Sequence, residues 1–155
     1  QMCIRDSVVI FRESLLAHAK ELGMTVIESE HYEADSFDAQ HFVSTVFAHP
    51  DRPTAIINQA NASVLSQVLM ALHDAGMSIP QDVSVLSCGT YFEGEPTRFP
   101  ITEMPVMPEE LCAEAMNLLV SAIEEHTDIK GSVELIEPAL KRRGSVAEAG
   151  SGGTI

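Results

Sequence analysis

Residues 54–86 read TAIINQANASVLSQVLMALHDAGMSIPQDVSVL, and this stretch decides the fold class. It opens with a short β-branched run, Thr54–Ile57, and closes with Val83–Leu86, which has little polarity on either face. Gly76 ends the helical pattern between the two runs. That pattern places four apolar residues at the i, i+3, i+4, i+7 spacing of one helix face: Leu65, Val68, Leu69 and Leu72. Strand, helix and strand in this order predict a right-handed crossover and a parallel sheet.

The chain before this stretch predicts two more helices and a strand. Residues 8–22 form an amphipathic helix that Gly23 stops, and Met24–Glu28 is a short β-branched strand. Asp35 or Ser36 can cap the next helix. The apolar stripes are Phe11, Leu15, Ala19 and Leu22 in the first helix, and Ala39, Phe42, Val43 and Val46 in the second.

The chain after this stretch continues the alternation. An irregular loop over residues 90–100 leads to a short strand, Ile101–Met104, and a helix begins at Pro108. A last strand is expected at Ser132–Ile136. The buried face of the helix is expected to be Leu111, Ala115, Leu118 and Ala122. The fold class is therefore α/β, with a parallel sheet covered by helices on both sides.

Composition limits the kinds of partner. A hydrophobic content of 45% and a charged content of 21% in 155 residues are typical of one globular domain. Nine Lys and Arg against 23 Asp and Glu give a net charge of -14, which repels nucleic acid phosphates and anionic membranes. No apolar run approaches the roughly 20 residues of a membrane-spanning helix. We expect no direct binding to DNA or to a membrane.

Enzyme and metal motifs are missing from the linear sequence. It contains no Gly-x-Ser-x-Gly, Gly-x-Gly-x-x-Gly or phosphate-loop string, so catalysis is disfavoured and no cofactor is expected. Three scattered cysteines form no Cys-x-x-Cys pair, and six histidines show no metal-ligand spacing. They are Cys3, Cys88 and Cys112, and His18, His31, His41, His49, His73 and His126. The basic triplet Lys141–Arg143 is expected to be a solvated terminus, and a reducing cytoplasm fits the cysteine use.

The two ends differ from the rest of the chain. Residues 1–7, QMCIRDS, resemble translated adapter sequence rather than natural protein, and we expect them to lie outside the domain. They also lack the apolar core of a signal peptide. Residues 148–155 include Gly-Ser-Gly-Gly and are expected to be a flexible tail.

Three segments, in this order, resemble the effector domain of LacI/GalR transcriptional regulators. They are Arg52–Ile57 leading to Asn61, then Ala71–Val85 with its Gly-x-x-Ile-Pro-x-Asp-Val-Ser-Val passage, and Pro100–Thr102 followed by Arg143–Ser145. The resemblance covers residues 8–147. It implies a type I periplasmic-binding-protein-like sensor domain truncated at its N-terminus, without the helix-turn-helix headpiece. It also implies that residues 105–126 return toward a missing N-terminal subdomain.

The resemblance also implies where a ligand is held. Asn61 stands where the family usually carries the Asp of Ala-Asn-Asp, although an Asn there is also a good helix cap. Gln59 can add a neutral donor and acceptor. The family's Gly-x-Asp is replaced by Ser87-Cys88-Gly89-Thr90, which moves the expected contacts to the residues after it. The remaining ligand candidates are Thr90, Tyr91, Phe92 and Tyr32. An aromatic pair such as Tyr91 and Phe92 is more often plain hydrophobic cover, and a lone Tyr such as Tyr32 is more often structural.

The function implied is sensing rather than catalysis. A small molecule such as a sugar binds between two subdomains, and the change in their angle alters a homodimer whose headpieces grip DNA. A periplasmic solute-binding protein of a sugar ABC transporter is the alternative. A fragment of an α/β enzyme is a third reading.

Overall fold

The computed structural model describes residues 2–28, 37–59, 62–88, 99–126, 128 and 136–148. The chain divides into two compact units, Gln1–Glu30 and His31–Ile155. None of the described helices is long and apolar enough to cross a membrane.

The first unit contains α1, Met2–Glu21. The helix ends as predicted at Gly23, whose φ of +68° lies in the left-handed region that glycine adopts without strain. The amide of Met24 donates to the carbonyl of Ala19 over 2.8 Å, which closes the last turn. The helix begins upstream of Val8, because residues 2–7 continue the same helical backbone.

The strand predicted at Met24–Glu28 is wrong. The segment forms no strand, and the side chains of Val26 and Ile27 are 43% and 57% exposed. A strand exists only where a second extended segment pairs with its backbone groups, and α1 is the other described element of this unit. The β-branched residues of this segment favour an extended backbone, but a strand also needs a neighbouring strand to pair with.

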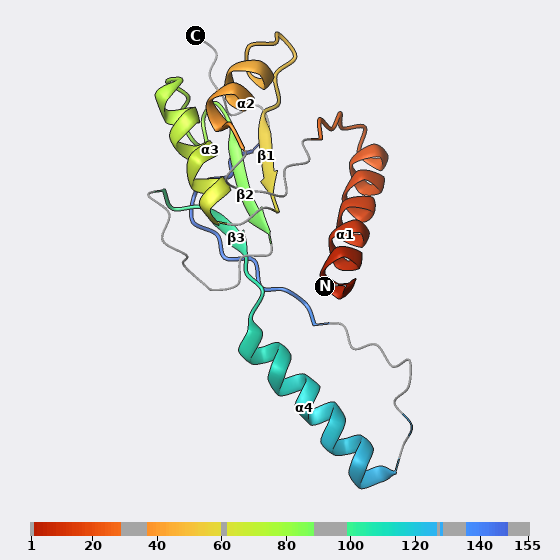
Figure 1. Ribbon diagram of the computed structural model, residues 1–155. Helices are drawn as coiled ribbons and strands as arrows, with labels where there is room; N and C mark the ends of the chain where they lie inside the picture. The colour runs from red at the N-terminus through yellow and green to blue at the C-terminus, as the bar shows by residue number, and fades with distance from the viewer. Residues whose placement is uncertain are drawn as a thin grey trace. The chain divides into compact units, whose positions relative to one another are not determined.

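The second unit is built on a three-stranded parallel sheet (Figure 1). Its strands are β1 (Ala55–Asn58), β2 (Ser84–Cys88) and β3 (Thr102–Met104), in the order β1-β2-β3. Ile56 pairs with Val85, and Leu86 pairs with Thr102. The parallel α/β class and these three predicted strands are confirmed, with boundaries shifted by one or two residues.

Two helices precede and follow β1. α3, Ala62–Asp74, is the predicted central helix, and α2, Ala39–Val46, packs against it. The four predicted core residues of α3 are all buried, at 6% exposed or less: Leu65, Val68, Leu69 and Leu72. They form one hydrophobic core with Val85 of β2 and with Val83, which directly precedes that strand. The cap of α2 is Asp38, whose carboxylate accepts from the amide of His41 over 2.9 Å. Asp35 and Ser36, the predicted caps, lie outside the described residues.

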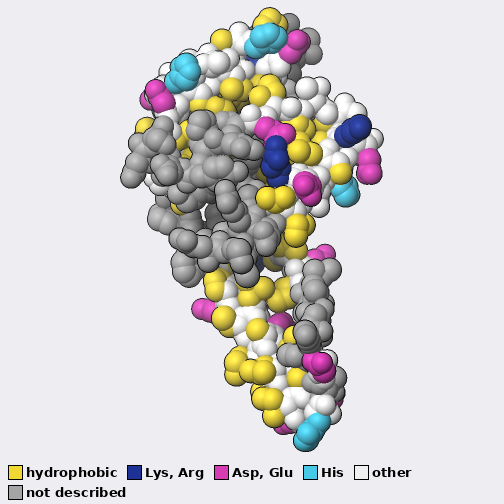
Figure 2. All heavy atoms as spheres, turned by 45° about the vertical axis from the view of Figure 1, so that its right-hand side comes forward, with side chains coloured by type: hydrophobic (Ala, Val, Ile, Leu, Met, Phe, Trp, Pro, Cys, Tyr) yellow, Lys and Arg dark blue, Asp and Glu magenta, His cyan; other side chains and the backbone are white. Residues whose placement is uncertain are grey.

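The fourth helix, α4, spans Pro108–Glu125 and begins at the predicted proline. None of its residues is buried, so the predicted burial of Leu111, Ala115, Leu118 and Ala122 is not found. Burial needs a facing surface, and no described element packs extensively against α4. Figure 2 shows hydrophobic side chains gathered along this helix. The most exposed large ones are Leu111, Met116, Leu119, Val120 and Ile123, at 42–65% exposed.

The C-terminal segment returns to the sheet. Lys141 forms an antiparallel bridge with Glu103, with backbone hydrogen bonds of 2.8 and 3.0 Å. The Arg143 guanidinium bonds the Glu103 carboxylate, and its side chain is 28% exposed. We expected Lys141–Arg143 to be a solvated terminus, and this is wrong for Arg143. Its guanidinium forms an ion pair with the buried carboxylate of Glu103 on β3. The strand expected at Ser132–Ile136 falls mainly on residues outside those described.

Candidate functional site

The carboxyl ends of the three strands carry a row of polar side chains. Asn58 on β1 pairs in register with Ser87 on β2, and Ser87 pairs with Glu103 on β3. Residues paired laterally in a sheet point to the same face, and Val85 lies two residues before Ser87 on that face. Since Val85 belongs to the core, the row lies on the core side of the sheet. All three side chains are buried, at 9%, 1% and 5% exposed.

Two of these residues are directly bonded. The side-chain amide of Asn58 donates to the hydroxyl of Ser87 over 3.3 Å. The bond lies at the last registered pair of the β1–β2 ladder. The ends of β1 and β2 are thus joined by a side-chain bond as well as by the backbone.

The third member of the row is tied to the C-terminal segment. The Arg143 guanidinium donates both to the Glu103 carboxylate and, over 3.3 Å, to the carbonyl of Ile101. The amide of Arg143 donates to the hydroxyl of Thr102 over 3.1 Å. An Arg beside a buried carboxylate neutralises it and satisfies its acceptor oxygens. Glu103 is therefore a structural anion here.

The Arg-Gly-Ser segment that carried part of the resemblance has a structural role. Gly144 has a φ of +87°, which turns the chain between Arg143 and Ser145. The Ser145 hydroxyl is buried and accepts from the amide of Thr102 over 2.7 Å. The amide of Val85 donates to the carbonyl of Ser145 over 2.8 Å. These bonds hold the segment between β2 and β3.

The cysteine at the end of β2 is not set up as a nucleophile. Cys88 is 3% exposed, and desolvation by burial raises the pKa of its thiol from 9.0 to about 11. The thiolate, which is the reactive form, is therefore scarce at neutral pH.

Among the predicted ligand residues, Gln59 is described. It follows β1 directly and is exposed beside the polar row. Five other candidates lie outside the described residues: Asn61, Thr90, Tyr91, Phe92 and Tyr32. Sequence reasoning missed Asn58, Ser87 and Glu103. The signal was a polar residue at the end of each apolar strand, and the strand register was needed to show that the three align.

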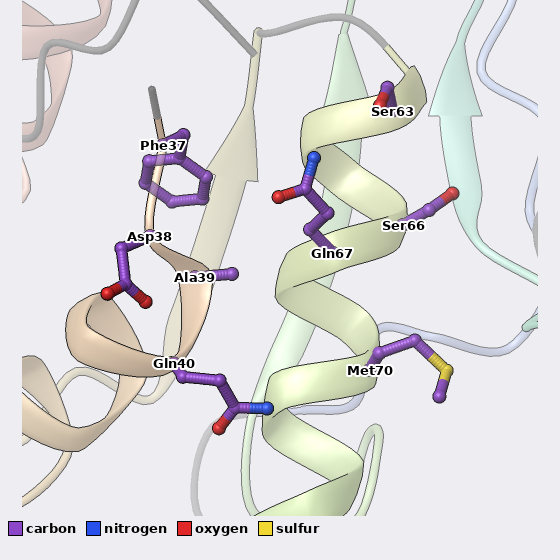
Figure 3. A pocket seen from close by; sticks show the side chains of 8 residues that line it. All are labelled: Phe37, Asp38, Ala39, Gln40, Ser63, Ser66, Gln67 and Met70. Atoms are coloured by element: carbon purple, nitrogen blue, oxygen red, sulfur yellow. The ribbon is translucent and has the colours of Figure 1, made fainter. Parts of the chain in front are cut away.

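A shallow groove of about 850 Å³ lies between α2 and α3 (Figure 3). Figure 3 shows Phe37 and Asp38 from the start of α2 across from Ser63 and Gln67 of α3. Its lining is Phe37, Asp38, Ala39, Gln40, Ser63, Ser66, Gln67 and Met70. Two of the polar groups are already used: Asp38 caps α2, and Gln40 donates to Asp74 over 3.1 Å. Gln59, the predicted ligand residue among those described, does not line this groove.

Metal binding has no support in the part of the chain that the structure describes, where no group of three or more His, Cys, Asp or Glu side chains gathers.

Comparison with known proteins identifies the fold. A family model described as a periplasmic binding protein-like domain matches residues 8–146. A search of curated proteins found no match. Among solved structures, a LacI family transcriptional regulator from Bifidobacterium animalis subsp. lactis is 24% identical, with a TM-score of 0.70. The alignment covers 91% of this chain and 51% of that regulator.

Two further structures contain sugars. A LacI family regulator from Arthrobacter in complex with lactose is 23% identical, with a TM-score of 0.66, over 87% of this chain and 50% of its own. A LacI family regulator from Lactobacillus casei with bound sucrose is 18% identical, with a TM-score of 0.60. The alignment covers 86% of this chain and 50% of that regulator. The chain thus spans about half the length of the structures it matches. Since the family model covers every described helix and strand apart from the start of α1, the chain belongs to the periplasmic binding protein-like domain family.

Proposed function

We propose that this chain is part of the ligand-sensing domain of a LacI/GalR-type transcriptional regulator. The observation that carries the proposal is the register of β1 and β2, in which Asn58 lies beside Ser87. Gln59 and Asn61 follow one of these strand ends, and Thr90 to Phe92 follow the other. In open parallel sheets, ligands bind outside the carboxyl ends of the strands, because helix N-termini and loop groups converge there.

The proposed ligand class is supported by the candidate site residues and by the structural neighbours. Gln59, Asn61 and Thr90 offer neutral donors and acceptors, which suit the hydroxyl groups of a sugar or a related metabolite. Structural neighbours hold lactose and sucrose, which makes small carbohydrates the first ligands to try. Neither a cofactor nor a metal ion is part of the proposal. The role is recognition, with Tyr32, Tyr91 and Phe92 as candidate ring contacts.

We propose that the regulator has two further parts, an N-terminal subdomain and a DNA-binding headpiece, which are not in this sequence. Residues 8–147 form a partial effector domain, and residues 105–126 return toward an N-terminal subdomain. The exposed apolar face of α4 supports that return, because five large side chains there have no described cover. DNA is bound by a helix-turn-helix headpiece of a homodimer in the cytoplasm, and the charge of -14 agrees with DNA binding elsewhere in the protein.

The test uses the full open reading frame that contains residues 8–147. Calorimetry with a panel of mono- and disaccharides, including lactose and sucrose, is expected to reveal a binder. Gln59→Ala and Asn61→Ala should weaken that binding, while Gln67→Ala in the groove between α2 and α3 should leave it unchanged. Ligand should then alter binding of the protein to operator DNA.

The alternative is a solute-binding protein of a sugar transporter, which shares the family fold. It predicts sugar binding without any effect on DNA, and a signal peptide where the regulator has its headpiece. Turnover of a sugar by the purified protein would instead favour an enzyme.

A further inference from the structure

The Asn58–Ser87–Glu103 row interrupts an apolar face. Two residues earlier on the same face, Ile56 pairs with Val85, and Val85 is fully buried. The change from apolar to polar thus occurs at the strand ends, where β1 and β2 lead into the residues proposed to contact the effector.

Burying polar groups at this place has an energetic cost. An amide and a hydroxyl taken from water must recover their lost hydrogen bonds, whereas apolar side chains would have no such requirement. Asn58 and Ser87 satisfy part of the requirement with each other, over 3.3 Å. The pair therefore favours one geometry of the strand ends, since the bond exists only when the two side chains align.

The bond also lies at one end of the backbone ladder between β1 and β2. Asn58 and Ser87 form the last registered pair of β1 and β2, and terminal pairs open more readily than central ones. A side-chain bond at this pair resists opening of the β1–β2 ladder at that end. No equivalent is needed at the centre of the ladder, because neighbouring pairs hold it on both sides.

We propose that Asn58 and Ser87 are positioning residues for effector binding. Their hydrogen bond fixes the separation of the ends of β1 and β2, from which the chain continues into the residues proposed to contact the effector. This inference rests on the proposed function for its ligand. Its structural part, the local tethering of two strand ends, is measurable without any ligand.

The experiment compares Ser87→Ala, Asn58→Ala and the double variant with a matched control on the same strand. The control is Ser84→Ala, because the Ser84 hydroxyl also accepts one hydrogen bond, from the amide of Ala147 over 3.1 Å, but lies at the start of β2. Amide hydrogen exchange by mass spectrometry follows peptides covering Asn58–Gln59 and Ser87–Cys88. Urea unfolding of each variant reports the global stability.

Each single variant at the pair should speed exchange at both strand ends by about fivefold, the loss expected for one hydrogen bond. The double variant should add little, because either change alone removes the bond. Ser84→Ala should leave these peptides unchanged. Equal acceleration along the whole of β1 and β2 in Ser87→Ala, or the same effect in Ser84→Ala, would overturn the proposal.

Binding supplies the second readout. In the full-length protein, Ser87→Ala should weaken whichever of lactose or sucrose binds by about fivefold relative to Ser84→Ala. Wild-type protein that binds neither sugar counts against the carbohydrate function, and the exchange data still decide the tether. Unchanged affinity in a Ser87→Ala protein with loosened strand ends would refute the positioning role.

Discussion

The Ser145 hydroxyl donates a hydrogen bond to the carbonyl oxygen of Val85 over 2.6 Å, although 60 positions separate the two residues. The Ser145 hydroxyl oxygen also accepts a hydrogen bond from the amide of Thr102. This hydroxyl therefore bridges β2 and β3 just before the two strands begin to pair at Leu86 and Thr102. The C-terminal segment is therefore an integral part of the sheet unit. Removing it would leave buried backbone groups of two strands without partners.

Ser145→Ala tests this bridge. The change leaves the buried amide of Thr102 and the carbonyl of Val85 without a hydroxyl partner, so we expect a loss of about 2–3 kcal/mol in unfolding free energy. Urea denaturation measures it. The matched control is Ser44→Ala, whose exposed hydroxyl bonds the carbonyl of His41 within one helical turn and should cost less than about 0.5 kcal/mol. Equal losses of unfolding free energy in the two variants would show that the Ser145 bridge contributes no more stability than an exposed hydroxyl.

Glu103→Gln tests the ion pair that ties β3 to the C-terminal segment. The substitution keeps the shape of the side chain but leaves the Arg143 charge, 28% exposed, without its counter-ion. We expect a loss of about 1–3 kcal/mol, below the value for a fully buried pair because Arg143 retains some solvent. Thermal unfolding compares this variant with Glu110→Gln, an exposed carboxylate of α4. A Glu103→Gln protein as stable as the control would mean that the pair adds no net stability.

The apolar face of α4 should make the isolated chain self-associate. Leu119 is 46% exposed on this face, whereas Ser121 lies on the other side of the helix, two residues away. Leu119→Lys should reduce association in sedimentation velocity runs, because a charge on an apolar contact surface must be desolvated. Ser121→Lys adds the same charge and should have little effect. A wild-type chain that stays monomeric at high concentration would contradict the expectation.

Alkaline pH should destabilise the protein through Cys88. Folding raises the pKa of this thiol from 9.0 to about 11, so the folded state holds the proton more tightly than the unfolded state does. The resulting stabilisation is fully present below pH 9 and is lost as the pH rises through 11. Urea unfolding across this range should show the decline, and Cys88→Ala should lack that part of it. Parallel curves for the two proteins would exclude Cys88 as the cause.

Local sequence patterns predicted the elements of the sheet unit well. The 3.6-residue period of Leu65, Val68, Leu69 and Leu72 identified α3 and its buried face, because a helix of this amphipathicity has one way to lie on a core. β1, β2 and β3 were found from short apolar runs, and Pro108 marked the start of α4. Motif order further led to the periplasmic-binding-protein-like fold, and a family model of that description matches residues 8–146.

The same patterns failed where an outcome depended on a distant partner. Val26 and Ile27 have the composition of a strand, yet their segment forms none. Leu111 and Leu118 have the spacing of a buried face, yet neither is buried in α4. Arg143 was expected in solvent because its sequence neighbours are polar, while its partner Glu103 lies 40 positions earlier. Of the predicted ligand residues, Gln59 alone falls among those described, beside the strand ends.

The sequence by itself determined the described helices and strands of the sheet unit and the family model that they match, since periodicity, β-branching, prolines and glycines act on neighbouring residues. Tertiary structure decided that Asn58, Ser87 and Glu103 align, and that the hydroxyl of Ser145 joins β2 to β3. The physical reason is register: a side chain meets its partner only after two strands have paired, and no local pattern encodes how far one strand slides along another.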